Sequence, residues 1–384
     1  MATNNLTALS PLLFSAAQTI ANEPTAVLEA ISNTFDDKGV AVGDKVIVPI
    51  APPATLDAFI PSNIPPTGDA ATATNVQVTI TNSSKVCWNL TGEQQRSLEN
   101  ATIETDWIRQ MIEQGMRTLR NDAEAKAWAA ALAGASRAVG TAGVTPFASD
   151  LSALAAVKRV LLNQGCPSAN VTAVIDTNAG QNLRKLGVYQ NFYQAGTDKQ
   201  LRSGIFLPAF GIDIAESAQV GMHAAGSLNA DVVTTDAAGD PLGTQIVGIG
   251  GAGAAINVTP QDALWFAADT TAAYMATNTL AAAGSVVLNR PGIAKYAIPT
   301  GNAVTMAASY TGNVVLERSS VVGAIRPPII PDNPTIQQLK ISDTKTGQTF
   351  LMLDIAQYGQ RTWELHLAYG FAAVQPAFIC ALLG

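Results

Sequence analysis

Hydrophobic and polar positions follow a helical period over residues 103–137, the longest regular stretch of the chain. Apolar or small residues recur there at intervals of three and four, which places them on one face of a helix. These residues are Trp107, Ile108, Met111, Ile112, Gly115, Leu119, Ala123 and Ala127. Thr102 or Thr105 is expected to cap the start, and Gly134 and Gly140 supply stop signals. A core helix of an ordinary enzyme would give the same stripe, so the flanking segments decide its meaning.

The segment before this helix has the period of strands. Lys45–Ile50 predicts one strand. Val76, Val78 and Ile80 alternate with polar residues and predict a second. A turn is expected at residues 82–84, after which the alternation continues to Leu90.

Between the two strands lies a stretch that is both apolar and rich in proline, with six prolines between positions 49 and 66. Proline blocks helix and central strand alike, so this part of the chain must be extended. Long loops are usually functional or disordered, and disorder favours charge over aliphatic residues. We interpret the stretch as an arm that lies on a neighbouring subunit; a lid over the chain's own core is the alternative. The residues expected to make the contact between subunits are Ile50, Pro52, Pro53, Leu56, Phe59, Ile60 and Ile64.

The remaining elements are shorter. Residues 1–37 have helical spacing broken by Pro11 and Pro24, which predicts an arm with one or two short helices. A second long helix is expected over 150–164, capped by Ser149 or Asp150, and a buried strand over 171–175. Asp176 is expected to cap a third helix that ends at Gly187. Residues 201–220 alternate like a strand.

Residues 221–308 are rich in Gly, Ala and Thr, and short strand-like runs occur at 244–249, 263–268, 285–288 and 303–307. This texture predicts a small inserted β-barrel or sandwich. Residues 362–374 form a last strand. Its buried face is expected to carry Trp363, Leu365, Leu367 and Tyr369, opposite Glu364 and His366.

Composition changes the picture because only 13% of the residues are charged, against a typical quarter, while 48% are hydrophobic. A free soluble domain needs surface charge to stay dispersed, so much of this exterior is expected to be covered by other chains. The net charge of −7 disfavours an electrostatic nucleic-acid binder. The three cysteines are far apart, which fits a reducing compartment. No apolar run is long enough to span a membrane, and no basic residue precedes Lys38, so no secretory signal is expected.

Candidate chemistry is sparse. Gly248–Gly253 spells G-x-G-x-x-G after a strand-like run, and Asp269 follows, as in a dinucleotide site. A crossover helix does not fit into residues 254–264, which contain Pro260, so we expect a turn-rich strand instead. His223 and His366 are the only histidines, and both are expected at a surface or interface. Arg109 and Glu113 are expected to form an i,i+4 pair. We therefore predict no catalytic residue, cofactor or metal site.

Four stretches share an order along most of the chain. The first is the extended loop followed by the long helix, from about Asp44 to Arg137. The second runs from Leu201-Arg202-Ser203-Gly204 through Gly211-Ile212-Asp213-Ile214 to Ser217. The third is Tyr310-x-x-Asn313 with Arg318 and Arg326-Pro327, and the last is Tyr369-Gly370 with Pro376. Together they resemble the major capsid (coat) proteins of tailed bacteriophages, which have the Hong Kong 97-type fold and in some members an extra β-barrel.

This resemblance implies an α+β fold with six parts: an N-terminal arm (1–43), an extended E-loop (44–90), the spine helix of a P-domain (91–140), an A-domain/P-domain β/α region (141–222), an inserted β-rich domain (223–308), and the closing strands (309–384). It implies a shell of hexamers and pentamers that encloses double-stranded DNA, with no membrane partner. A scaffolding protein and a portal are further implied partners, and a decoration protein is left open. The virion is the implied location, with assembly in the host cytoplasm.

Two rival functions remain from the residues themselves. One is a nicotinamide-dependent oxidoreductase that uses the glycine loop at 248–253. The other is a secreted, self-associating surface protein, which fits the low charge and the Thr-rich strands but not the missing signal.

Overall fold

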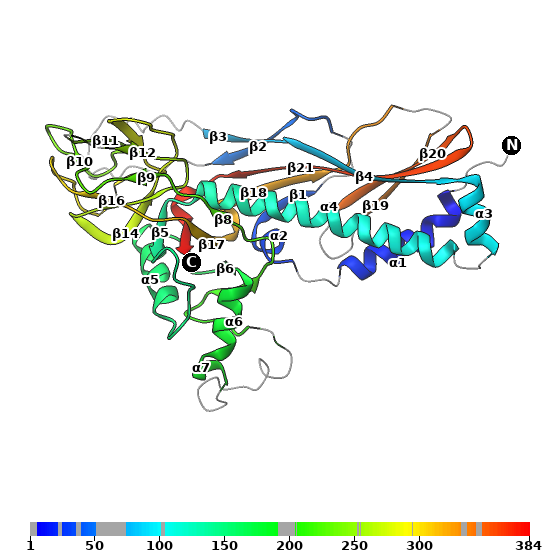
Figure 1. Ribbon diagram of the computed structural model, residues 1–384, viewed down its shortest axis with the longest axis horizontal. Helices are drawn as coiled ribbons and strands as arrows, with labels where there is room; N and C mark the ends of the chain where they lie inside the picture. The colour runs from blue at the N-terminus through cyan, green and yellow to red at the C-terminus, as the bar shows by residue number, and fades with distance from the viewer. Residues whose placement is uncertain are drawn as a thin grey trace, which may run out of the picture.

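The computed structural model describes residues 6–21, 25–35, 40–50, 74–100, 104–190, 204, 206–251, 253, 255–293, 295–331, 336–342 and 348–384; for a few of these, Ile50 among them, it describes the backbone alone. Figure 1 shows an elongated body in which one long helix runs under a sheet. A β-rich region lies at one end, and the helices α5, α6 and α7 project below the body near that end.

The long helix is α4 (Glu104–Gly134), close to the predicted bounds. The predicted apolar stripe is confirmed, because its residues from Ile108 to Ala127 are buried except for Met111, which is partly buried, and Met116 is added to them. The stripe packs on β21 (Gln360–Ala373), whose four predicted inward residues are all fully buried. Gly115 permits this approach, since a Cβ there would lie 3.3 Å from the Trp88 ring and 3.5 Å from Leu365.

The sheet above α4 has six strands. Its path is β1 (Ser32–Phe35), β18 (Val321–Arg326), β21, β20 (Thr349–Gln357) and β19 (Ile336–Ser342), with β4 (Asn82–Thr91) paired to β21. Only β1 joins its neighbour in parallel. The turn predicted at residues 82–84 is wrong, because these residues pair with Tyr369, Ala368 and Leu367 as the start of β4.

A second sheet has nine strands and supports the shorter helices. Its path is β16 (Val304–Met306), β13 (Ala263–Phe266), β14 (Asp269–Met275), β5 (Arg137–Gly140), β22 (Ile379–Leu383), β17 (Tyr310–Glu317), β6 (Val171–Ile175) and β7 (Asp213–Glu216), with β8 (Met222–His223) paired to β17. Buried Asn313 joins three of these segments: its Oδ1 accepts from the Asp176 backbone N–H at 2.7 Å, and its amide donates to the Leu382 carbonyl at 3.2 Å.

The predicted helix over 150–164 is confirmed as α5 (Ser152–Asn163); Leu151 holds the N-cap position, and the Asp150 carboxylate accepts from the Ser152 N–H at 2.9 Å. Asp176 caps α6 (Thr177–Lys185) as predicted. The predicted end at Gly187 is wrong, because α6 ends at Lys185 and Gly187 begins α7 (Gly187–Gln190). Of the strand-like run predicted over 201–220 around Pro208 and Gly211, residues 213–216 form β7, and Phe210 and Gly211 have positive φ and make a tight turn before it.

The predicted β-rich insert contains further short strands. These are β9 (Ser227–Leu228), β10 (Val233–Thr234), β11 (Ile246–Gly250), β12 (Ile256–Asn257) and β15 (Gly284–Val287). They form the sheets β10-β11-β15 and β12-β9, while β13, β14 and β16 extend the nine-stranded sheet. A hydrophobic cluster from Val232 to Val304 fills this region. A separate barrel and the bounds 223–308 stay predictions.

The N-terminal segment departs from its prediction. Helix α1 (Leu6–Ala21) continues through Pro11, and its buried face, which includes Leu13 and Ile20, packs on α4 of the same chain. The Arg120 guanidinium on α4 donates to the Ile20 carbonyl. A short helix, α2 (Val27–Ala30), follows. The described part of the arm therefore lies on its own subunit. Paired strands before the long helix, a β/α region after it and closing strands at the end follow the predicted order, and the predicted α+β class is confirmed.

Candidate interaction surfaces

The two strands predicted on either side of the proline-rich stretch form an antiparallel ribbon. They are β2 (Lys45–Ile50) and β3 (Thr74–Thr79), and their register runs from Lys45 opposite Thr79 to Ile50 opposite Thr74. Among the described strands, β2 and β3 pair only with each other. An isolated two-stranded ribbon is marginally stable in water, so this one depends on what its faces contact.

One face of the ribbon packs on the six-stranded sheet. Val78 and Ile80 are fully buried there against residues of β18 and β21, including Val322 and Ala368. The opposite face is open: Ile47 is 60% exposed, and its cross-strand partner Gln77 is also exposed. The ribbon thus has a root held by its own subunit and an outer face with an apolar side chain in solvent.

Six of the seven predicted contact residues, from Pro52 to Ile64, lie outside the described residues. The seventh, Ile50, ends β2, and the structure describes its backbone only. The contact of these residues with a neighbouring subunit stays a prediction.

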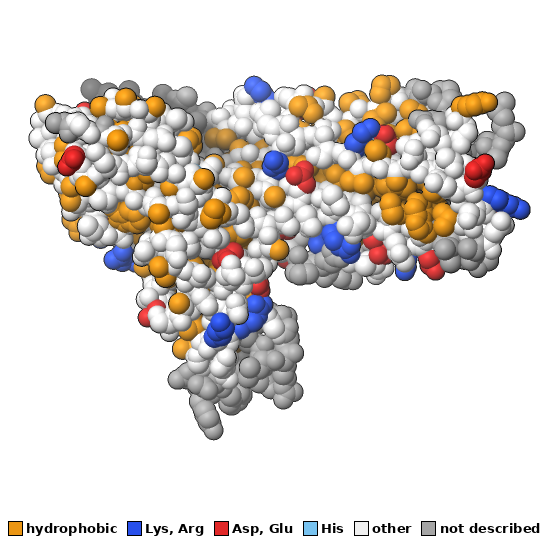
Figure 2. All heavy atoms as spheres, in the orientation of Figure 1, with side chains coloured by type: hydrophobic (Ala, Val, Ile, Leu, Met, Phe, Trp, Pro, Cys, Tyr) orange, Lys and Arg blue, Asp and Glu red, His pale blue; other side chains and the backbone are white. Residues whose placement is uncertain are grey.

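Exposed apolar side chains also occur away from the ribbon. The large ones that are at least 46% exposed are Phe14, Val42, Val144, Leu162, Val188, Phe210, Met222, Leu242, Ile246, Tyr296, Ile329 and Tyr358. Figure 2 shows hydrophobic side chains spread over the face in view, with few charged groups between them. Single exposed apolar residues are normal, but their number on an exterior with so little charge agrees with the predicted covering by other chains.

The two histidines are partly buried in the single chain, and their predicted place at a surface or interface stays a prediction. The His223 ring contacts Asp262 at 2.8 Å and Tyr310, and its side chain is 10% exposed. His366 contacts Glu364 at 3.0 Å, and burial lowers its pKa in spite of this carboxylate. Both rings act as packed, hydrogen-bonded groups. The Arg109–Glu113 pair is confirmed, with Nε and Oε1 3.8 Å apart.

The glycine-rich segment lies on a strand, as predicted. Gly248 and Gly250 belong to β11, and the short strand β12 follows where a dinucleotide site needs a helix. A Cβ on Gly248 would lie 2.7 Å from both the Asp236 carboxylate and the Thr235 hydroxyl. The Gly248 N–H donates to Asp236 at 2.8 Å. Gly248 therefore makes room for a carboxylate of its own chain.

Asp240, in the same region, gives a pH-dependent stability. Burial first, and then the neighbouring Asp236, raise its pKa to about 6. Between about pH 4 and 6 the folded chain holds a proton that the unfolded chain has released, so the free energy of unfolding falls as pH rises through this window. Asp240→Asn removes the titration, and its amide can donate to Asp236. We expect this variant to be more stable than the parent at pH 7 by about 1–2 kcal/mol, allowing for solvent screening.

Urea unfolding at pH 4 and pH 7 measures this difference, which should shrink at the lower pH. Asp231→Asn, a change at an exposed carboxylate of the same region, is the matched control and should show no such pH dependence. Equal effects of the two substitutions at both pH values would contradict the account.

Within the described residues, no group of three or more His, Cys, Asp or Glu side chains could hold a metal ion. No helix in the described part of the chain is long and apolar enough to cross a membrane.

Comparison with known proteins gives structural similarity without sequence similarity. No protein-family model and no curated protein matches the chain. Among solved structures, Mycobacterium phage Che8 is similar with a TM-score of 0.47 and 13% identity, over 88% of this chain and 84% of the other. The capsid of Cyanophage P-SCSP1u gives 0.46 and 11%, over 94% and 88%. The virus-like particle from Pyrococcus furiosus gives 0.45 and 9%, over 97% and 98%.

Proposed function

We propose that the protein is the major capsid protein of a tailed bacteriophage, and that its copies assemble into an icosahedral shell around double-stranded DNA. One observation carries this proposal. The β2–β3 ribbon has its root packed on the sheet of its own subunit, while its outer face stays exposed and its described edges pair with nothing else.

A shell is stable because each subunit repeats the same modest contacts with its neighbours. A standard interface buries about 1,600 Å² in total, and an extended ribbon with an apolar tip adds contact area outside the body of the subunit. When every subunit contacts several neighbours, closure of the lattice makes each contact intramolecular in effect, so the whole is far more stable than one pair. The low surface charge reduces the repulsion between copies.

The finer parts of the proposal follow the sequence resemblance. Hexamers and pentamers build the shell in the host cytoplasm, a scaffolding protein and a portal take part, and a decoration protein is an open partner. The net charge of −7 supports a lumen that encloses DNA without binding it specifically.

Deletion of residues 51–66 tests the proposal. The chain should keep the helical content of the parent, because α4 and both sheets lie outside the deletion, and it should form no shells. Negative-stain electron microscopy of concentrated protein, with circular dichroism for the fold, measures both. In a second variant, residues 51–66 are replaced by a Gly/Ser segment of the same length. This variant keeps the loop length and removes the apolar and proline side chains. Full-sized particles from both variants would refute the role of the loop, and a stable monomer from the parent at high concentration would refute the shell.

A further inference from the structure

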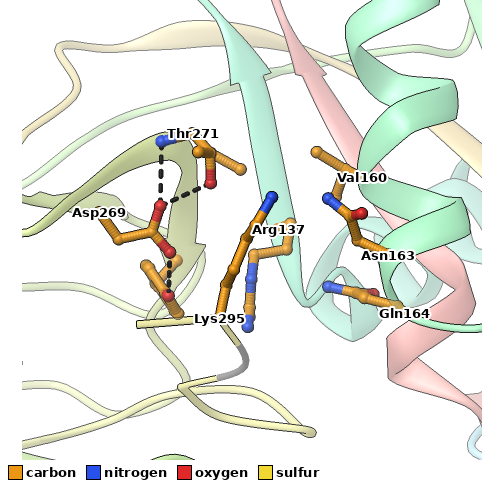
Figure 3. A pocket seen from close by; sticks show the side chains of 9 residues that line it. Arg137, Val160, Asn163, Gln164, Asp269, Thr271 and Lys295 are labelled. Atoms are coloured by element: carbon orange, nitrogen blue, oxygen red, sulfur yellow. Dashed lines mark hydrogen bonds between the residues drawn. The ribbon is translucent and has the colours of Figure 1, made fainter. Parts of the chain in front are cut away.

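A pocket of about 250 Å³ lies between α5, β5 and β14, at the junction of the helical region with the β-rich region. Its polar lining consists mainly of Arg137, Asn163, Gln164, Asp269, Thr271 and Lys295 (Figure 3). The strand register builds the pocket, because Arg137 on β5 is the cross-strand partner of Tyr274 on β14.

Arg137 places a positive charge in the wall of this pocket. Its side chain is 4% exposed, and its guanidinium stacks 4.0 Å from the centre of the Tyr274 ring. It donates to the carbonyls of Ser136 and Gly292. Burial lowers the pKa of Arg137, although it stays charged at neutral pH. These acceptors are neutral carbonyl groups, so they solvate the Arg137 charge only through their dipoles. A nearby anion would stabilise this buried charge further.

Asp269 supplies one negative charge, but its oxygens are already engaged. Oδ1 accepts from the Thr271 N–H at 3.0 Å and from the Thr271 hydroxyl, and Oδ2 accepts from the Tyr274 hydroxyl at 2.7 Å. Burial alone would raise the pKa of Asp269, yet these hydrogen bonds and the Arg137 charge lower it, so it is ionised at neutral pH. Lys295 in the lining adds a second positive charge, and the Arg159 guanidinium adds a third where it donates to the Thr271 carbonyl. Arg137 and Lys295 thus line the pocket together with a single carboxylate, in a chain whose net charge is −7.

Several hydrogen-bond donors face the pocket. Figure 3 shows the Lys295 ammonium reaching into the space between Asp269 on one side and Asn163 and Gln164 on the other. The Gln164 Oε1 accepts from the Ser136 hydroxyl at 3.1 Å, which leaves its amide N–H groups for the pocket. A site with available donors and an excess of positive charge fits a group that carries several acceptor oxygens.

We propose that this pocket binds an oxyanion, a phosphate or carboxylate group, through Lys295 and the side-chain amides of Asn163 and Gln164. The group has two possible sources with the same chemistry. One is a free anion. The other is an acidic side chain of a second copy of the chain, and this second source rests on the proposed function.

The first experiment uses unassembled full-length protein and inorganic phosphate at constant ionic strength. Phosphate at tenfold its Kd should raise the Tm by about 2 °C. Lys295→Gln should weaken phosphate binding about tenfold or more, because it removes a charge-assisted hydrogen bond. Asn163→Asp should abolish it by adding a negative charge. Lys126→Gln removes the same charge from an exposed site on α4, outside the pocket, and should leave phosphate binding unchanged.

The second experiment distinguishes the sources in assembled particles. If phosphate no longer raises their Tm, while Lys295→Gln lowers the Tm of the particles, a carboxylate of a neighbouring copy fills the pocket. If phosphate still raises it, the ligand is a free anion. A phosphate effect that is absent from the parent protein, or equal in the parent and both pocket variants, would overturn the proposal. Because the first experiment needs no shell, a failure of assembly leaves its result standing.

Discussion

A Gly370→Ala substitution is expected to displace the root of the β2–β3 ribbon and to prevent shell formation. The end of β3 crosses directly over β21 at this glycine. A Cβ at position 370 would lie 2.1 Å from the Thr79 carbonyl oxygen and 2.8 Å from the Ile80 Cα. Both are backbone atoms, so no side-chain rotation relieves the clash and the ribbon must move.

The displacement opens the small cluster in which Val78 and Ile80 are buried. Overpacking of this kind costs about 1–3 kcal/mol of subunit stability. Its effect on assembly is larger, because each 1.4 kcal/mol lost at one contact is about tenfold in affinity and the lattice repeats that contact in every subunit. We expect a folded subunit of lower stability that yields no particles.

Urea unfolding and negative-stain microscopy measure the two effects separately. Gly92→Ala is the matched control, since a Cβ there meets nothing within 4 Å and its φ is not positive. That change should shift stability by about 0.5 kcal/mol or less and leave particles intact. Particles in normal yield from Gly370→Ala, at unchanged stability, would show that the ribbon is not fixed by this crossing.

The elements that could be predicted from the sequence are those whose burial is one-sided over many residues. The apolar stripe of α4 and the inward side chains of β21 face each other in the main core. The helical period of α4 and the alternation of β21 therefore each reflect one buried face. The ribbon strands and α5 were predictable for the same reason, and β6 was predictable as a short apolar run that is almost wholly buried. The α+β fold class then followed from the order of these elements.

Local signals failed where long-range packing was stronger. Pro11 does not break α1, because burial of Leu13 and Ile20 on α4 outweighs the one hydrogen bond that proline removes. The Asn82-Ser83-Ser84 run favours a turn, yet pairing with β21 keeps it extended. Helix α3 (Gly92–Asn100) has no buried residue and left no apolar stripe to read.

The oxyanion pocket could not be predicted from any single stretch. In the sequence, Arg137 lies at the end of a helical pattern, and Asp269 is an acidic residue that follows a glycine motif. Neither position indicates a pocket. They meet because β5 pairs with β14, and β14 itself is a Thr- and Ala-rich run with weak strand character. Register between distant strands is a property of the folded chain, and a single sequence does not contain a local signal for it.

A Glu124→Leu substitution is expected to weaken the packing of the N-terminal segment on the rest of the subunit. Glu124 on α4 is 4% exposed, and its Oε1 accepts three hydrogen bonds. Two come from the backbone N–H groups of Ala26 at 3.1 Å and Val27 at 3.4 Å, at the start of α2. The third comes from the buried Ser217 hydroxyl at 2.7 Å, just after β7. One carboxylate therefore joins the arm, the long helix and the β/α region.

Leucine matches the size of the side chain but leaves three buried donors without an acceptor. Each such group costs about 1–3 kcal/mol, so the free energy of unfolding should fall by at least about 3 kcal/mol. Glu124→Gln keeps an acceptor oxygen and should lose less. Ser217→Ala removes one donor and should cost about 1 kcal/mol. In a double-mutant cycle Ser217→Ala should no longer destabilise on the Glu124→Leu background and should recover part of the loss, since it removes a donor that leucine has left without an acceptor.

Urea unfolding of the four proteins measures the cycle. Additive effects would mean that Glu124 and Ser217 act independently, and an unchanged midpoint for Glu124→Leu would mean that the arm is held by its apolar contacts alone. Glu124 is buried between the arm, α4 and the β/α region, whereas Gly370 lies under the ribbon. The two substitutions therefore separate an effect on subunit stability from an effect on assembly. If Glu124→Leu, at a greater loss of stability, still forms particles while Gly370→Ala does not, the failure of assembly belongs to the ribbon and not to a weakened fold.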